Sequence, residues 1–205
     1  MEHSYAEGMT WIRTIAWPEA DGQLKEAYDW QAAALGSPAE FTILGSLYPA
    51  IVEERLRLYR VVEHCPSSLT PVERQAAALT TSLLNGTGHC ASGLQLKLRS
   101  LGVSEDAIHA IQHDPAVPTT GEPRLDSICR HAAKLTLTPK AMAEDDLVSL
   151  RTHGLSDLDL LDLNNIVSYY NYINRVVMGL GLRSEIATAH EATNAVPGDE
   201  ANQTS

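Results

Sequence analysis

The most informative stretch of the chain covers residues 70–102 and reads TPVERQAAALTTSLLNGTGHCASGLQLKLRSLG. Its first half predicts a helix that starts at Thr70. Thr70 can cap this helix, Pro71 suits its first turn, and Glu73 can bond back to the cap as a capping box. The pair Asn85-Gly86 predicts where the helix ends, because these residues readily adopt the left-handed backbone conformation.

The second half of the stretch predicts another helix, from Thr87 to about Leu101. We expect the Thr87 hydroxyl to cap it by accepting a backbone N–H. The 22 residues between Arg74 and Lys97 carry no formal charge, so we expect this helix pair to be buried in the core or against another subunit. Buried Thr, Ser, Asn, His and Gln side chains among small apolar residues are typical of a small-molecule site.

The rest of the chain predicts an all-α fold, because β-branched runs and hairpin signals are nearly absent. Pro49 should kink or break the helix over 40–63. Glu53, Glu54, Arg55 and Arg57 interrupt the apolar positions of that helix, and we expect them to face water. The remaining predicted helices cover residues 21–35, 104–113, 123–137, 141–153 and 157–180, the last one capped by Ser156.

Composition excludes several classes of protein. The chain has 205 residues, with 15 Lys plus Arg against 26 Asp plus Glu, a net charge of −11. Such a charge repels phosphate backbones and anionic membrane surfaces, so we expect no nucleic-acid or membrane partner. No signal peptide or transmembrane run is visible, which predicts a cytoplasmic protein.

One helical domain over residues 1–191 is the simplest organisation, since no linker is visible in mid-chain. We expect its first 20 or so residues to form an irregular arm. Residues 192–205 are small, polar and contain Pro and Gly, and we expect them to form a disordered tail.

The three cysteines have no paired spacing, which fits a reducing compartment. Cys90 falls in the first turn of its helix, where the positive end of the helix dipole favours a thiolate. A reactive Cys90 and a buried, inert one are both open readings. Cys65 and Cys129 are expected to be core residues.

His89 and Glu73 are the other candidate catalytic residues. His89 is either an acid/base group or an interior histidine, and Glu73 is a helix cap before it is a catalyst. We expect no metal and no cofactor. His109 and His113 have chelating spacing on a short helix, but no carboxylate pattern accompanies them.

The segment 69–102 resembles the core of the AhpD-like superfamily, which contains alkylhydroperoxidases, peroxidase-related proteins and carboxymuconolactone decarboxylases. ADGQLKEAYD over 20–29 and YYNYINRVVMGLGL over 169–182 are similar to the peroxidase-related branch. The resemblance spans about residues 10–185. It implies an all-helical bundle of about seven to eight helices that assembles as a homo-oligomer, namely a dimer, trimer or hexamer.

The catalytic motif of the peroxidase members is degenerate in this chain. The first cysteine of their C-x-x-C pair falls on Thr87 and the second on Cys90, their histidine falls on Leu94, and their glutamate falls on Gln75. A peroxide cycle needs a second thiol to resolve the sulfenic acid as a disulfide. The resemblance therefore implies that the two-cysteine relay is lost.

Three functions follow from these residues. The first is an enzyme that acts on a small organic molecule by acid/base chemistry, of decarboxylase, lyase or isomerase type, with His89 as proton carrier. Gln75, Thr87, Asn174 and Arg175 would line its substrate site, supported by Glu73. The alternatives are a single-cysteine alkylhydroperoxidase-like antioxidant protein that uses Cys90, and a non-catalytic oligomeric binding protein.

Overall fold

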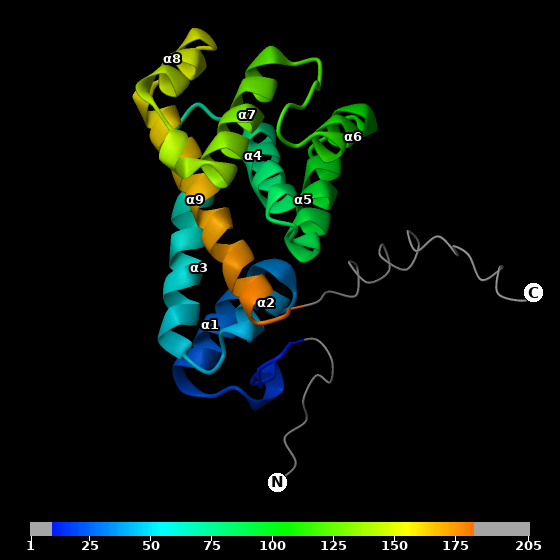
Figure 1. The fold of residues 1–205 in the computed structure, drawn as a ribbon. Coiled ribbons are helices and arrows are strands. Elements are labelled where there is room, and N and C mark those ends of the chain that lie inside the picture. Colours follow the sequence, from blue (N-terminus) through cyan, green and yellow to red (C-terminus); the bar gives the residue numbers. More distant parts are fainter. Residues whose placement is uncertain (1–9, 183–205) are drawn as a thin grey trace, which may run out of the picture.

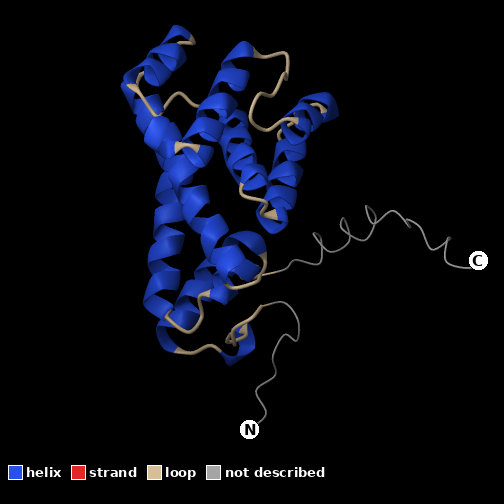
Figure 2. Ribbon diagram, viewed as in Figure 1, coloured by secondary structure: helices blue, strands red, loops and turns tan. Residues whose placement is uncertain are grey.

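The structure is a computed structural model that describes residues 10–182, and every regular element in that part of the chain is helical (Figures 1 and 2). The all-α prediction is confirmed. The predicted tail at 192–205 and the first nine residues of the predicted arm lie outside the described residues. The helices are α1 (Gly22–Leu35), α2 (Glu40–Leu44), α3 (Pro49–Glu63), α4 (Pro71–Leu84), α5 (Gly88–Ser100), α6 (Glu105–His113), α7 (Pro123–Leu137), α8 (Glu144–Thr152) and α9 (Asp157–Gly179), with short 3-10 turns at Trp17–Glu19 and Pro139–Ala141.

Local sequence signals set most of these boundaries. Gly36 and Gly86 have φ angles of 83° and 70°, and they end α1 and α4 in the left-handed region that glycine tolerates. Thr70 and Glu73 form the predicted capping box, with Thr70 N donating to Glu73 Oε2 at 2.8 Å and Glu73 N to Thr70 Oγ1 at 3.2 Å. Ser156 caps α9 in the same way.

The predicted helix over 40–63 is two helices, α2 and α3, because Pro49 begins a new one after a turn. The expectation that all four charged residues of α3 face water is wrong for one of them. Arg55 is only 6% exposed, whereas Glu54 and Arg57 are exposed and Glu53 is half-buried.

Helix α4 lies at the centre of the bundle and packs against α5, α7 and α9 (Figure 1). Its residues from Gln75 to Ser82 are all buried, as the absence of charge predicts. Helix α5 follows that expectation only in part, since Ala91 and Leu94 are buried but Leu96 is 51% exposed. None of the described helices is both long enough and apolar enough to span a lipid bilayer.

The buried apolar residues form two clusters that meet at α3. The main cluster is built around α4, α5, α7 and α9, and the second holds Leu24 and Tyr28 of α1 against Val52 and Leu56 of α3. Helix α9 runs beside α3 and also contacts α4 (Figure 1). The boundary between the two clusters, which we call the seam, therefore lies between α3 and α9.

A buried ion pair joins α4 to α9. Arg74 Nη2 lies 2.7 Å from Asp162 Oδ2, and the two side chains are 7% and 1% exposed. The same guanidinium donates to the carbonyls of Val62, Cys65 and Leu69. The guanidinium thus joins the end of α3 and the segment that follows it to α9.

Asp159 anchors the same connection from the start of α9. It accepts hydrogen bonds from the backbone N–H groups of Ser68 at 2.6 Å and Ser156 at 2.7 Å. Burial alone would raise the pKa of Asp159, but these hydrogen bonds to Ser156 and Ser68 outweigh it and lower the pKa to about 2. The carboxylate stays ionised and holds the end of the loop.

Candidate functional site

Thr87 immediately precedes α5, and His89 and Cys90 lie in the first turn of that helix, as the sequence predicts, but Thr87 does not cap α5. Its hydroxyl makes no hydrogen bond to a backbone N–H of the helix. Thr87 Oγ1 instead lies 3.4 Å from Met178 Sδ of α9. The predicted cap is therefore wrong, because the packing of α9 against this turn offers the buried hydroxyl another partner.

Cys90 packs against the main apolar cluster from the first turn of α5. Burial raises the pKa of its thiol to about 12. The helix dipole favours the thiolate at this position, but its effect is smaller than the cost of removing the charge from water. Near neutral pH the sulfur is therefore a protonated thiol.

His89 lies at the edge of the bundle, where α5 meets the start of α2. Its Nδ1 is 3.2 Å from Glu40 Oε2, without the alignment of a hydrogen bond. Burial lowers the pKa of His89. The imidazole is therefore neutral near pH 7 and can accept a proton.

Glu73 is engaged in structure at the far end of α4. Besides completing the capping box at Thr70, it accepts a hydrogen bond from Arg124 Nε at 2.6 Å. Both carboxylate oxygens are therefore occupied, and α4 separates Glu73 from the turn that carries Thr87.

Gln75 belongs to a half-buried polar cluster that spacing in the sequence does not reveal. Its Nε2 donates to Glu63 Oε2 at 3.1 Å, and Lys97 Nζ donates to the same oxygen at 2.9 Å. The three residues come from α4, α3 and α5. A carboxylate from α3 thus lies beside Gln75, the position on which the resemblance places a glutamate.

Tyr59 extends this polar cluster by one residue. Burial raises its pKa, and the Glu63 carboxylate adds to that effect while Lys97 opposes it. Burial would lower the pKa of Lys97, but Tyr59 and Glu63 outweigh it and raise that pKa. The cluster therefore holds a protonated phenol, an ammonium group and a carboxylate in contact.

A pocket of about 210 Å³ lies at the seam between the two apolar clusters, and we call it the tyrosine pocket. One wall is α3, another is α9, and the end of α1 and the start of α2 complete it. Among its lining residues are Phe41, Arg55, Leu56, Tyr59, Tyr169 and Tyr170. Tyr59 thus belongs both to the wall of this pocket and to the polar cluster behind it.

The predicted residues of α9 do not line the tyrosine pocket. Asn174 is fully buried and accepts a hydrogen bond from Ser82 Oγ at 3.3 Å. Arg175 is exposed and donates to Asn171 Oδ1 at 2.7 Å. Cys90 is also outside the lining, but it is close enough to Tyr170 to add to the raised pKa of that residue, after burial and the effects of Tyr59, Glu63 and Tyr169.

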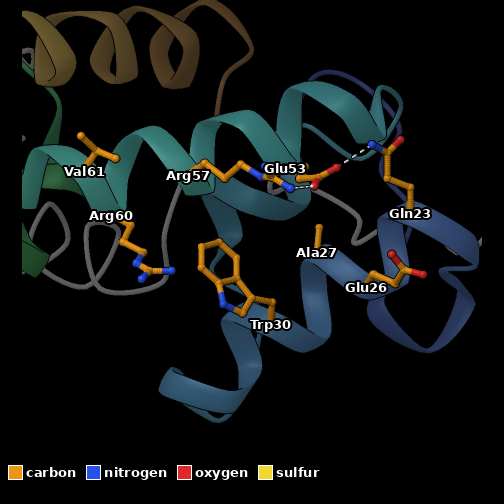
Figure 3. Close-up of a pocket in the computed structure, with 8 residues that line it drawn as sticks. All are labelled: Gln23, Glu26, Ala27, Trp30, Glu53, Arg57, Arg60 and Val61. Carbon is orange, nitrogen blue, oxygen red and sulfur yellow. Dashed lines mark hydrogen bonds and ion pairs between the residues drawn. The ribbon is translucent and has the colours of Figure 1, made fainter.

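A second hollow, of about 540 Å³, lies between α1 and α3 (Figure 3). Gln23 Nε2 of α1 donates to Glu53 Oε2 of α3 across it at 2.7 Å, and Arg57 pairs with the same carboxylate group. Most of the charged groups here are exposed to water, which weakens their interactions. The tyrosine pocket, with its desolvated groups, is the stronger candidate site.

Within the described residues, no group of three or more His, Cys, Asp and Glu side chains is placed to hold a metal ion. The His109 and His113 rings stack with their centroids 6.1 Å apart.

Comparisons with known proteins define the class to which this fold belongs. No family model and no curated protein matches the sequence. Solved structures do match. A peroxidase-related protein with an alkylhydroperoxidase AhpD core from Ralstonia eutropha has a TM-score of 0.78 and 17% identity, over 88% of this chain and 94% of that chain.

Two further structures are similar. A peroxidase-related protein from Silicibacter sp. has a TM-score of 0.74 and 20% identity, over 89% of this chain and 95% of that chain. The debrominase Bmp8 without ligand has a TM-score of 0.72 and 13% identity over the same shares, and a variant of it has been crystallised with 2,3,4-tribromopyrrole. The chain has the AhpD-like fold, and at these identities the likeness establishes the fold alone.

Proposed function

We propose that this protein is a non-redox enzyme that moves a proton on a small organic molecule bound in the tyrosine pocket. The reaction is of the decarboxylase, lyase or isomerase type. The observation that carries the proposal is the position of Tyr59, which lines the pocket and contacts the Lys97–Glu63–Gln75 cluster. An open pocket with a connected polar chain behind it also argues against a filled, non-catalytic core.

Each member of the chain has a role that follows from its charge. The Tyr59 phenol is protonated at neutral pH and donates a proton to the substrate. Lys97 stabilises the phenolate that forms, because its ammonium group is beside it. Glu63 fixes the position of Lys97 through the 2.9 Å ion pair, and Gln75 orients Glu63.

His89 has a supporting place in this proposal. Its partner Glu40 lies between Ala39 and Phe41 in the sequence, and both of these line the pocket. A neutral imidazole at this edge can take up a proton from solvent and pass it on to the Tyr59 phenolate, so that Tyr59 is a phenol again at the end of each turnover. His89 therefore keeps the role of proton carrier, while Tyr59 is the group that touches the substrate.

The raised pKa of Cys90 is the observation against a single-cysteine peroxidase. Attack on a peroxide needs a thiolate, and a buried neutral thiol provides almost none at neutral pH. Acid/base chemistry at Tyr59 needs no change in the oxidation state of any residue.

The test is proton exchange. A panel of small carbonyl and carboxylic compounds is incubated with the protein in D₂O, and loss of proton signals is followed by NMR. We expect exchange or turnover with at least one compound. The Tyr59→Phe variant should lower the rate by about a hundredfold or more, the usual contribution of a general acid.

Cys90→Ser is the matched control, because it changes one atom beside the pocket and removes the thiol. It should keep most of the activity, and circular dichroism should show both variants folded. Activity that survives Tyr59→Phe but is lost in Cys90→Ser, or a robust reduction of hydroperoxides by dithiols, would contradict the proposal.

A further inference from the structure

Arg55 is a buried cation in the wall of the tyrosine pocket that no carboxylate balances. It is 6% exposed, and its Nε and Nη2 atoms have no hydrogen-bond partner. None of the ion pairs between described residues includes it. A buried charge without a counter-ion is costly, so it is found where something else supplies the opposite charge.

The surroundings hold the guanidinium in place without neutralising it. The ring of Phe41 lies 4.4 Å from the guanidinium carbon, in a cation–π contact. Burial lowers the pKa of Arg55, and the phenols of Tyr172 and Tyr169 act in the opposite direction. Arginine stays charged even so, because its unperturbed pKa is far above neutral.

Gly45, in the turn between α2 and α3, leaves room for this arrangement. A Cβ atom at position 45 would collide with Arg55 Nη2. The φ angle of Gly45 is −87°, which any residue can adopt. Glycine is therefore needed here because a side chain would collide with the guanidinium, and not because of the backbone conformation.

The same donor pair is used elsewhere in this chain to hold a carboxylate. Arg99 donates from Nε to Glu105 Oε1 at 2.7 Å and from Nη2 to Glu105 Oε2 at 3.0 Å. Such two-point pairing is the strongest contact that a guanidinium makes with a carboxylate. Arg55 has the same two donors without a partner, but both atoms are enclosed by the protein, so the guanidinium must turn to present them to a carboxylate in the pocket. None of the described residues that line the pocket is acidic.

We infer that the tyrosine pocket binds a small planar carboxylic acid, with its carboxylate on Arg55 and its ring or double bond between Phe41 and the tyrosines. The volume of 210 Å³ is below the range of roughly 300–1,000 Å³ for drug-sized ligands, which limits the ligand to about one ring. Because Arg55 is the one unpaired cation among the described lining residues and the walls are apolar, we expect the ligand to carry a single negative charge on an otherwise apolar molecule.

The inference rests on the proposed function for one point only, that this acid is the substrate. Arg55 and Tyr59 lie one turn apart on α3, so both face the pocket from the same side of the helix. A carboxylate bound at Arg55 brings the adjoining carbon atoms near the Tyr59 phenol. Binding itself does not depend on turnover and is measured separately.

The experiment compares benzoate with benzamide, which has the same shape and no charge, by calorimetric titration of the full chain. We expect benzoate to bind at least about tenfold more tightly than benzamide and than inorganic phosphate. Arg55→Met should remove this preference. Arg57→Met, on the exposed side of the same helix, should leave it unchanged.

Two further variants keep the test decisive if Arg55→Met does not fold. Gly45→Ala retains the charge and displaces the guanidinium, and Arg55→Lys retains the charge without the planar donor pair. Both should weaken benzoate binding by about tenfold while benzamide binding stays the same.

Each outcome separates the two proposals. Benzoate binding that depends on Arg55, together with no exchange or turnover, supports this inference and overturns the proposed function. Equal binding of benzoate and benzamide, unchanged benzoate binding in the Arg55 variants, or no binding at about 10 mM benzoate overturns the inference, even if the enzyme turns over an uncharged compound.

Discussion

The reactivity of Cys90 distinguishes a thiol peroxidase from an enzyme whose reaction does not use this thiol. With a pKa of about 12, against an ordinary value of about 8.5, the thiol supplies roughly 3,000-fold less thiolate at pH 7. A more basic thiolate is intrinsically more nucleophilic, which returns a factor of about 40. Cys90 should therefore react about a hundredfold more slowly than an ordinary thiol, before any steric hindrance is counted.

The assay is alkylation by iodoacetamide, with the labelled Cys90 peptide quantified by mass spectrometry and glutathione in the same tube as the ordinary thiol. In native protein the rate should rise about tenfold for each pH unit up to about pH 10, without a plateau. In urea, Cys90 should react like glutathione, because unfolding removes the burial that raises its pKa.

Rapid labelling of native Cys90 at pH 7, with a plateau below about pH 8, would refute this reasoning. It would mean that the helix dipole outweighs desolvation at this position, and it would return the single-cysteine peroxidase to first place.

Other predictions concern the framework of the fold and position 87, on which the resemblance places a cysteine. Arg74→Met should destabilise the protein by about 3–5 kcal/mol in urea titrations, because it leaves the Asp162 carboxylate buried and unpaired, whereas the exposed Arg57→Met should cost less than about 1 kcal/mol. The low pKa of Asp159 stabilises the folded protein fully above the unfolded pKa of about 3.9, and this stabilisation is lost as the pH falls through about 2. Asp159→Asn should therefore make the free energy of unfolding depend less on pH in the acid range. An unchanged dependence would contradict the assignment. Thr87→Cys should not confer dithiol-dependent hydroperoxide reduction, since a second thiol does not change the burial of the sulfur that must attack; a clear gain of this activity would show that only the missing thiol blocks it.

Much of the fold could be predicted because its signals are local. The capping boxes at Thr70 and Ser156 and the positive φ angles at Gly36 and Gly86 each depend on a few consecutive residues. The Thr87 cap was wrong for the opposite reason. A side chain of α9, distant in the sequence, determines which partner the hydroxyl takes.

The candidate site depends on contacts of this distant kind. Glu63, Gln75 and Lys97 belong to three different helices, and each has the spacing of an ordinary surface or core residue in its own helix. Arg55 was expected to face water, since charged residues on an amphipathic helix usually do. The sequence holds one signal that could have corrected this, namely Gly45 in a turn, but it becomes meaningful only when the guanidinium is known to lie against it.

Positions 75 and 94, on which the resemblance places a glutamate and a histidine, lie in the same part of the bundle as the polar cluster. Leu94 and Gln75 are 5% and 1% exposed, and neither side chain is ionisable, so neither can carry a proton to Cys90. The ionised groups in this part of the bundle are Glu63 and Lys97, which form an ion pair. Both interact with Tyr59, which lies in the wall of the tyrosine pocket. If this arrangement serves acid/base chemistry, Leu94→His with Gln75→Glu should not create hydroperoxide reduction, because the proton path would still end at a phenol while the thiol stays buried. Tyr59→Phe in that background should lower the proposed acid/base activity by about a hundredfold or more. A gain of thiol-dependent peroxide turnover in the double variant would instead show that these two side chains are enough to restore a thiol relay.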